Sequence, residues 1–281
     1  MIASTHDGRR GFTVRQATIP VLPILLTAVL MTACQTSALG RRQVKLFPES
    51  AMSEMGVTAF AEISQQTPVS SNASANRVVG CVAGAVTGAI GGHYPRISWE
   101  VRVFEDDTPN AFALPGGKIG VNTGLLRVAR NQHQLATVIG HEVEHVLQGH
   151  SNERVTAEFG KQAALDVLEA AIVDPTNAMH GQMFGLLGAG VQIGVLMPFG
   201  RQHETEADLL GLDLMARAGF DPRESVTLWR NMAAAGGAQP PEFLSTHPSH
   251  GTRIADLNQR MDSAMQLFAE AASSGRVPGC R

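Results

Sequence analysis

Hydrophobic and polar positions recur at helical spacing along most of this chain. Apolar residues three and four positions apart define one face of each segment, which is typical of an amphipathic helix packed on a core. Proline, glycine and aspartate mark the ends of these segments. The predicted helices cover Glu49–Gln66, Gln132–His150, Asn152–Val173, a segment that starts at Asp221-Pro222, and Gly251–Ala272. The chain is therefore expected to be predominantly helical.

A short region between the predicted helices alternates with period two instead. Ile97–Phe104 places Trp99 on one side and Glu100 on the other, as in a half-buried strand. Ala111–Leu114 and Lys118–Val121 flank the turn sequence PGG, which predicts a hairpin. We expect an α+β fold with a small sheet of about three strands.

Two apolar stretches raise the question of a membrane span. Asn76–Gly92 has glycines at 80, 84 and 88, a spacing that permits close approach of another backbone on a helix. Gly181–Phe199 is uncharged for nineteen residues but contains internal glycines and two glutamines. We interpret the first as a buried packing helix, and the second as buried or resting on a membrane in preference to spanning it.

The N-terminus has the layout of an export signal. Arginines precede the apolar stretch Ile19–Ala33, which is too short for a comfortable span. Leu30–Cys34 resembles a lipobox, which predicts a lipoprotein signal peptide over 1–33 and lipidation of Cys34; the alternative is an ordinary signal peptide with a chance cysteine. Gln35 follows the cysteine instead of aspartate, which by resemblance to sorted lipoproteins favours the outer membrane, and Arg9-Arg10 leaves twin-arginine export open. Residues 34–48 are predicted to be a polar tether and 49–281 a single domain, with N-terminal helices over 49–92.

Composition and charge limit the partners of the chain. The 281 residues are 44% hydrophobic and 17% charged, which supports a well-filled core. The net charge is −3, and the basic residues form no long run, so nucleic acid is not an expected partner. Cys81 and Cys280 leave two alternatives open: a disulfide that closes a loop of about 200 residues, or two free buried thiols.

The stretch VIGHEVEHVLQGH, residues 138–150, carries the most specific chemistry. His141 and His145 lie four apart and share one helix face, whereas His150 on the same helix would point to the opposite side. Glu142 is about 100° round from His141, so it can lean over a metal held by the two imidazoles. This H-E-x-x-H spacing is typical of a zinc hydrolase.

A catalytic zinc needs a third protein ligand. The sequence RQHETEAD, residues 201–208, offers Glu204 with Asp208 one turn later, so that a ligand and a carboxylate supporting a ligand histidine share one face. Glu206 is the rival ligand, about 200° away. His203 is expected to be exposed.

These motifs resemble a known family. HEVEH and ETEAD, with NAFALPGGKIGVNTGLL upstream and STHPSHGTRI downstream, are similar to the zinc metallopeptidase family of the CAAX prenyl protease and HtpX, above all its soluble, lipid-anchored bacterial members. The resemblance implies a zincin-like metallopeptidase domain with a catalytic core over 97–257 and a C-terminal helix over 251–272. It also implies one Zn²⁺ per chain, with His141, His145 and Glu204 as ligands and Glu142 as the general base.

Two further roles follow from the resemblance alone. Asn110–Leu114 and Gly120–Thr123 match the region where family members add an extended substrate to an edge strand, so Asn110, Ala111, Phe112 and Asn122 are candidate substrate contacts. His247 matches a histidine that can reach the metal and hold the enzyme inactive. A transition-state hydrogen-bond donor and a plain loop histidine are the alternatives for His247, and His250 is a weaker candidate for the same role.

The expected function is a zinc-dependent endopeptidase in the bacterial periplasm, anchored to the outer membrane by its N-terminal lipid. Unfolded or misassembled envelope proteins are the substrates that the resemblance implies. The alternative is a lipid-anchored chaperone or assembly factor for outer-membrane proteins that retains a zinc site. No tetratricopeptide repeat follows the catalytic region to supply a docking module, and the sequence does not predict an oligomeric state.

Overall fold

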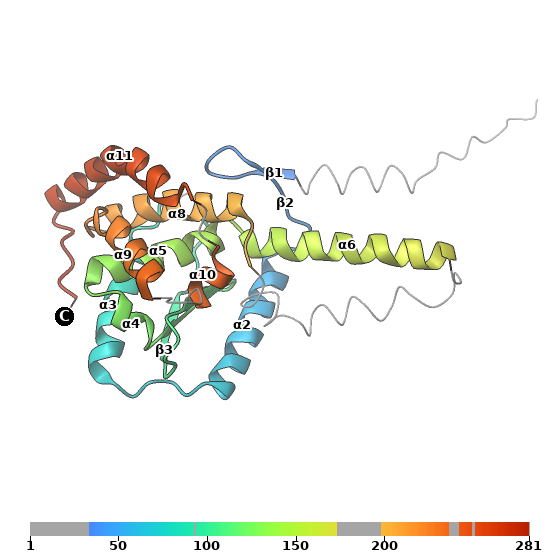
Figure 1. Cartoon of the computed structure of the whole chain (residues 1–281), viewed down its shortest axis with the longest axis horizontal. Helices are drawn as coiled ribbons and strands as arrows, with labels where there is room; N and C mark the ends of the chain where they lie inside the picture. Colours follow the sequence, from blue (N-terminus) through green and yellow to red (C-terminus); the bar gives the residue numbers. More distant parts are fainter. Residues whose placement is uncertain (1–33, 93, 173–197, 236–241, 249–250, 281) are drawn as a thin grey trace, which may run out of the picture.

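The computed structural model describes residues 34–92, 94–172, 198–235, 242–248 and 251–280 (Figure 1). The expected signal peptide, nearly all of the 181–199 stretch, the break at 236–241 and His250 lie outside these ranges. The elements of the described part, in chain order, are β1 (Cys34–Thr36), β2 (Arg42–Val44), α2 (Glu49–Gln66), α3 (Ala73–Gly88), β3 (Glu100–Phe104), β4 (Ala111–Leu114), β5 (Lys118–Asn122), α4 (Leu125–Val128), α5 (Gln132–Leu147), α6 (His150–Ile172), α8 (Arg201–Arg217), α9 (Glu224–Ala235), α10 (Glu242–Thr246) and α11 (Arg253–Ser273). Most of these elements are helices, as predicted for a predominantly helical α+β fold. Within these ranges, none of the helices has both the length and the apolar character that crossing a membrane requires.

The three-stranded sheet has the order β3-β5-β4. Strands β4 and β5 form the predicted antiparallel hairpin, and β3 pairs with β5 in parallel. Gly116 and Gly117 make the hairpin turn at φ of +81° and +76°, a region that residues with a Cβ rarely adopt. Strands β3 and β4 form the two edges of this sheet, and β5 lies between them. Asn122 lies on the central strand β5, so the expectation that it belongs to an edge strand is wrong.

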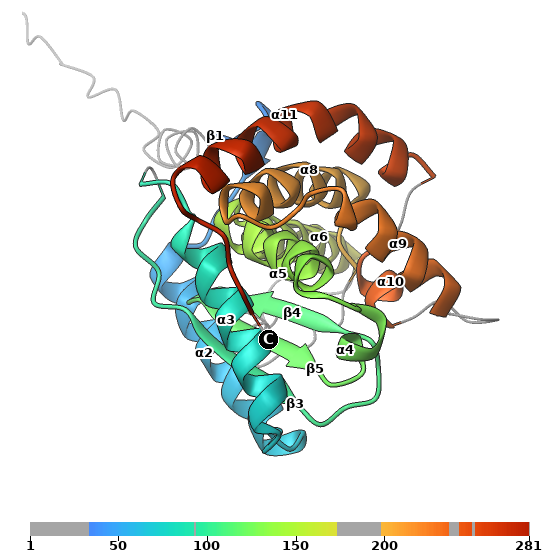
Figure 2. The same ribbon diagram turned by 90° about the vertical axis from the view of Figure 1, so that its left-hand side faces the viewer.

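Helices cover the sheet in successive layers. Helix α5 contacts β4, α8 packs on α5, and α11 packs on α8, an order that Figure 2 shows from the sheet outwards. The backbones of α5 and α8 approach closely, because a Cβ on Gly140 would lie 2.9 Å from the carbonyl oxygen of Gly211. This close crossing brings the predicted ligands of the two helices within reach of one another.

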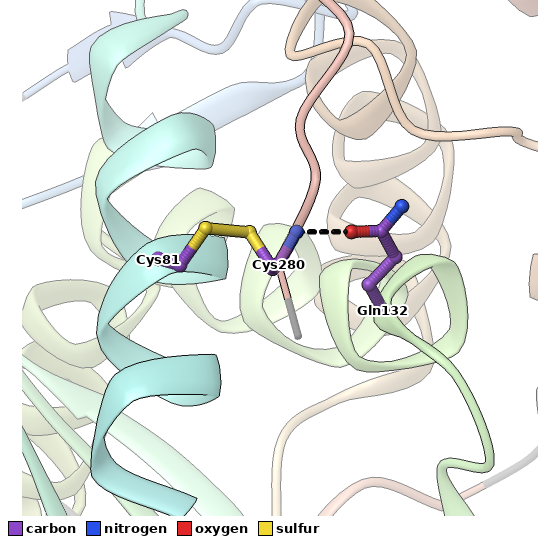
Figure 3. Close-up of a disulfide and its surroundings, with 3 residues drawn as sticks. All are labelled: Cys81, Gln132 and Cys280. Atoms are coloured by element: carbon purple, nitrogen blue, oxygen red, sulfur yellow. Dashed lines mark hydrogen bonds between the residues drawn. A yellow bond between two sulfur atoms is a disulfide. The ribbon is translucent and has the colours of Figure 1, made fainter. Parts of the chain in front are cut away.

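Helix α3 packs on the other elements through Val79, Val82 and Val86, which are fully buried. The glycines at 80, 84 and 88 face open space, so our interpretation of them as a close backbone contact is wrong. Cys81 of α3 forms a disulfide with Cys280, near the C-terminus (Figure 3). The backbone N–H of Cys280 donates to Gln132 Oε1 at 2.7 Å, which fixes the C-terminal segment beside the start of α5.

The predicted tether is an ordered hairpin. Strands β1 and β2 pair in antiparallel fashion and lie beside the first turns of α6 (Figure 1). Gln43 Nε2 donates to the carbonyl oxygen of Gln148 at 2.8 Å, and the backbone N–H of Leu46 donates to Thr156 Oγ1 at 3.0 Å. These bonds attach the N-terminal hairpin, residues 34–48, to the corner between α5 and α6, so the prediction of a tether is wrong.

Candidate metal centre

Helix α5 supplies the first two metal-ligand candidates. Asn131 caps the helix by accepting from the backbone N–H groups of His133 and Gln134, which sets where the first turn begins. One face then carries His141 and His145, whose Nε2 atoms lie 3.1 Å apart. Both side chains are buried.

Helix α8 and the segment after α10 complete the cluster. Glu204 Oε1 lies 3.4 Å from His145 Nε2, and Glu204 Oε2 lies 3.5 Å from His141 Nε2. His247 Nδ1 lies 3.2 Å from His141 Nε2 and 3.1 Å from Glu204 Oε1. The four side chains offer ligand atoms that all lie within 4.8 Å of one another.

This donor set fits a zinc ion. Donors placed tetrahedrally at 2.0–2.1 Å from zinc are about 3.3–3.4 Å from one another, and the five donor separations given above run from 3.1 to 3.5 Å. Two imidazoles and a carboxylate match the protein ligands of zinc peptidases, which leave the fourth position to water or substrate. Here His247 stands at that fourth position.

An aspartate and an arginine support His141 from behind. Asp208 Oδ1 lies 3.0 Å from His141 Nδ1, so the structure brings Asp208 to the place predicted for it. Arg253 Nε donates to Asp208 Oδ2 at 2.6 Å, and its Nη2 donates to Glu204 Oε2 at 2.7 Å. Sequence reasoning missed Arg253, whose one signal is its place in the downstream motif STHPSHGTRI.

A second histidine supports His145. His150 Nδ1 lies 2.9 Å from His145 Nδ1, and His150 Nε2 lies 3.1 Å from Glu206 Oε2. The expectation that His150 points away is wrong, because α5 ends at Leu147 and Gly149, at φ of +70°, turns the chain back. Glu206, the rival ligand in the sequence, contacts His150 and so lies behind the ligands.

Glu142 occupies a buried position beside the four donors. Its Oε2 accepts from the backbone N–H of Ala113 on β4 at 3.1 Å, and its Oε1 lies 3.3 Å from His247 Nε2. Burial raises the pKa of Glu142, and the nearby His247 and His141 oppose that rise. A carboxylate with a raised pKa holds a proton more readily, as a general base must.

Glu204 shows the opposite balance. Burial alone would raise its pKa, but the positive charge that His247 and His141 can carry, with hydrogen bonds from His145 and His247, holds the pKa of Glu204 far below its usual range. The carboxylate therefore stays ionised, as a metal ligand must be.

Aromatic rings enclose the histidines. Phe199 stacks on His145 with ring centroids 3.9 Å apart, and Phe243 stacks on His247 at 4.4 Å. His203, expected to be exposed, is 17% exposed and stacks on His150 at 4.5 Å. This expectation is wrong, because the turn at Gly149 brings His150 beside the first turn of α8.

The predicted substrate strand lies directly against this cluster. Ala111 and Phe112 are on the edge strand β4, and Asn110 precedes it, with its carbonyl oxygen accepting from the backbone N–H of Asn122 at 3.0 Å. The bond from Ala113 to Glu142 joins this strand to the expected general base. Substrate binding by these residues stays a prediction.

The sequence of the chain is similar to sequences of known peptidases. The model of a family described as "Peptidase family M48" matches residues 73–261, which include all of the donors described above. The chain is similar to the "Mitochondrial metalloendopeptidase OMA1" of Schizosaccharomyces pombe, with 40% identity over 171 residues that make up 60% of this chain and 48% of the relative.

Two other relatives extend this comparison. The "Metalloendopeptidase OMA1, mitochondrial" of Homo sapiens is 34% identical over 61% of this chain and 34% of its own. The "Beta-barrel assembly-enhancing protease" of Escherichia coli is 32% identical over 60% of this chain and 36% of its own. The chain thus spans about half of the first relative's length and about a third of each of these two.

Proposed function

The chain belongs to peptidase family M48, and we propose on this basis that it is a zinc metalloendopeptidase. The observation that carries the proposal is the buried cluster of His141, His145, Glu204 and His247 with Glu142 at its side. The relatives named as metalloendopeptidases align with this chain over about 60% of its length, which supports the same activity.

The side chains divide the chemistry between them. His141, His145 and Glu204 would hold the zinc ion, which when bound supplies a Lewis acid for the scissile carbonyl and lowers the pKa of water towards about 7. Glu142 accepts the proton of the attacking water and passes it to the leaving amine. Because the backbone N–H of Ala113 fixes Glu142 Oε2, the other oxygen, Oε1, is the atom that holds this proton.

With His247 in its present position, the proposed enzyme would be latent. Its Nδ1 takes the position of a fourth zinc donor, and its Nε2 lies 3.3 Å from the general-base oxygen Glu142 Oε1. A water molecule needs both of these positions for attack on a peptide. We propose that His247 must move away before substrate is cleaved.

The proposed substrates are unfolded or misassembled proteins of the bacterial envelope, with the lipid on Cys34 as an outer-membrane anchor. The apolar stretch at 19–33 before Cys34 and the similarity to a bacterial assembly-enhancing protease support this location. The Cys81–Cys280 disulfide also fits an oxidising compartment. The edge strand β4 offers backbone groups, so binding by strand addition would depend little on side chains.

The test compares two neighbouring glutamates of α5. Glu142→Gln is expected to keep about one zinc per chain while cutting the cleavage of unfolded casein about 10²- to 10⁴-fold. Glu144→Gln is the matched control, because Glu144 is equally buried but accepts from Gln148 Nε2, away from the donors. Cleavage that survives Glu142→Gln would rule out the peptidase mechanism, and client assembly that survives it without cleavage would favour the chaperone alternative.

A further inference from the structure

We propose that Arg41, on the N-terminal hairpin, is a positioning residue for the zinc ligand His145 and acts through Glu206 and His150. This inference rests on the zinc site of the proposed function. The hairpin lies outside residues 73–261, which the family model matches. Arg41 therefore adds a part to the site from a segment that the family match does not include.

The direction of each hydrogen bond follows from the metal. His145 turns Nε2 towards the other donors, so a zinc-bound neutral ring carries its proton on Nδ1. The partner of that proton is His150 Nδ1, at 2.9 Å, which must accept. His150 then carries its own proton on Nε2 and donates it to Glu206 Oε2 at 3.1 Å.

Glu206 can hold this direction only while its carboxylate stays fixed. The side chain is 3% exposed, so water does little to stabilise its charge. Arg41 Nε and Nη2 both donate to Glu206 Oε2, at 3.1 and 2.8 Å. The same oxygen thus accepts from the arginine and from His150.

Glu153 holds the guanidinium of Arg41 in turn. Arg41 Nη1 donates to Glu153 Oε2 and Arg41 Nη2 to Glu153 Oε1, both at 2.6 Å, which is the bidentate geometry that fixes a guanidinium plane. Gln43 Nε2 donates to Glu153 Oε1 at 2.7 Å, so two side chains of the hairpin meet one carboxylate of α6. The docked hairpin therefore determines where Arg41 stands.

The two histidine ligands are supported in the same way, each through a chain of side chains that ends at an arginine. His141 faces Asp208, which Arg253 holds, and His145 faces His150 and then Glu206, which Arg41 holds. A partner on the outer ring nitrogen fixes the tautomer and orientation of a metal-bound histidine. The position of the hairpin is thereby coupled to the strength of the zinc site.

The zinc dissociation constant of the full chain, measured by competition with a chelator, tests this coupling. Arg41→Ala is expected to raise the constant about 10- to 100-fold, the usual effect of losing an outer partner of a metal ligand. Arg42→Ala, an exposed neighbour on the same hairpin, is the matched control and is expected to change nothing. Arg41→Lys should recover part of the loss, because an ammonium keeps the charge but cannot form the fork.

Nitrogen NMR of the histidine rings in the zinc-loaded protein separates positioning from a general loss of fold. The wild type and Arg42→Ala should show His150 protonated on Nε2 alone, whereas Arg41→Ala should show a mixture of tautomers. If Arg41→Ala does not fold, Arg41→Lys takes its place in both measurements. Wild-type affinity and a wild-type tautomer in the Arg41 variants would overturn the inference and leave the peptidase proposal intact, whereas a wild type that binds no zinc would overturn both.

Discussion

Each zinc-ligand candidate on α5 has a second residue behind it, and Arg253 is the buried cation that contacts both acidic side chains of the His141 side. Its guanidinium is 3% exposed, joins Glu204 to Asp208, and lies 4.1 Å over the ring of Trp229. One cation thus compensates two buried carboxylates, of which one is a ligand and the other holds a ligand. Without this arginine both negative charges would face each other in a dry interior.

Replacing Arg253 should therefore destabilise the metal-free protein more than the zinc-loaded one. Arg253→Met keeps the side-chain length but leaves two uncompensated buried charges, which costs about 3–5 kcal/mol of unfolding free energy. Zinc restores part of this loss by supplying positive charge beside Glu204. Urea unfolding with a chelator and with zinc measures both values. Arg223→Met, which breaks an exposed pair with Asp221, is the control and should change the unfolding free energy little; an equal loss in both variants would contradict this account.

Local spacing explains which of these residues sequence could reveal. His141, Glu142 and His145 lie on one turn of a helix, and Glu204 and Asp208 on another, so helical geometry alone predicts that each group converges. Arg253 follows Asp208 by 45 positions, and no local pattern joins the two. A helix that continued through Gly149 would point His150 away from the metal ligands. The chain turns at Gly149 instead, and the local pattern does not reveal this turn.

Among the elements, the crossing of α5 and α8 matters most for the site, because each of these helices carries part of the ligand set. A Cβ on Gly211 would lie 2.8 Å from the backbone nitrogen of His141 and 3.0 Å from its Cα. The two backbones meet at the residue that begins the zinc motif. Any side chain at Gly211 must therefore push the ligands of one helix away from those of the other.

Gly211→Ala is expected to lower the unfolding free energy by about 1–3 kcal/mol, as overpacking does elsewhere, and to weaken zinc binding at the same time. Gly160→Ala on α6 is the matched control, because a Cβ there meets nothing within 4 Å. The control should stabilise the protein by up to about 1 kcal/mol through helix propensity alone. Unfolding curves and zinc titrations of both variants test this prediction. Unchanged zinc affinity in Gly211→Ala would show that the distance between α5 and α8 does not determine the geometry of the zinc ligands.

Elements with strong local signals were predicted well from the sequence. Helix α2 has the predicted limits, α5 and α11 differ from theirs by a few residues, and the β4–β5 hairpin turns at the predicted glycines. The regular glycines of α3 gave a false signal, since they face open space. The glycines that do permit close approach, Gly140 and Gly211, sit singly on different helices, so no spacing rule within one helix could identify them.

At the scale of the whole molecule, both ends of the described chain are fastened to the domain. The hairpin at 34–48 docks on the corner of α5 and α6, and the disulfide joins Cys280 to Cys81 across a sequence separation of 199. Cross-linking residues this far apart removes many conformations from the unfolded chain. The C-terminal segment after α11 is thereby held against α3 and the start of α5.

Replacing both cysteines by serine is expected to lower the unfolding free energy by about 5 kcal/mol in the chain-entropy model. Reductant should produce a similar loss in the wild type and none in the double variant, as measured by urea unfolding. Equal stability of the oxidised wild type and the variant would mean that the disulfide adds nothing to the fold.

The whole-molecule features were the least predictable from sequence. Two cysteines without a distance left the disulfide and two free thiols as equal alternatives, and only the fold brings Cys81 and Cys280 together. The polar composition of residues 37–48 is typical of a tether. Arg41 in fact binds Glu153 and Glu206, which lie more than a hundred positions further along the chain, so the local sequence gives no sign of this contact. Polar residues that pair over such distances resemble solvated ones in a single sequence.

Under the proposed function, cleavage depends on Glu142 once His247 has left the site. The decisive measurement is the rate at which the zinc-loaded His247→Ala variant cleaves unfolded casein, with and without the additional change Glu142→Gln. We predict that His247→Ala cleaves faster than the wild type and that Glu142→Gln then reduces the rate about 10²- to 10⁴-fold at unchanged zinc content. Cleavage that persists in the double variant would contradict the assignment of this site as the centre of a zinc metallopeptidase.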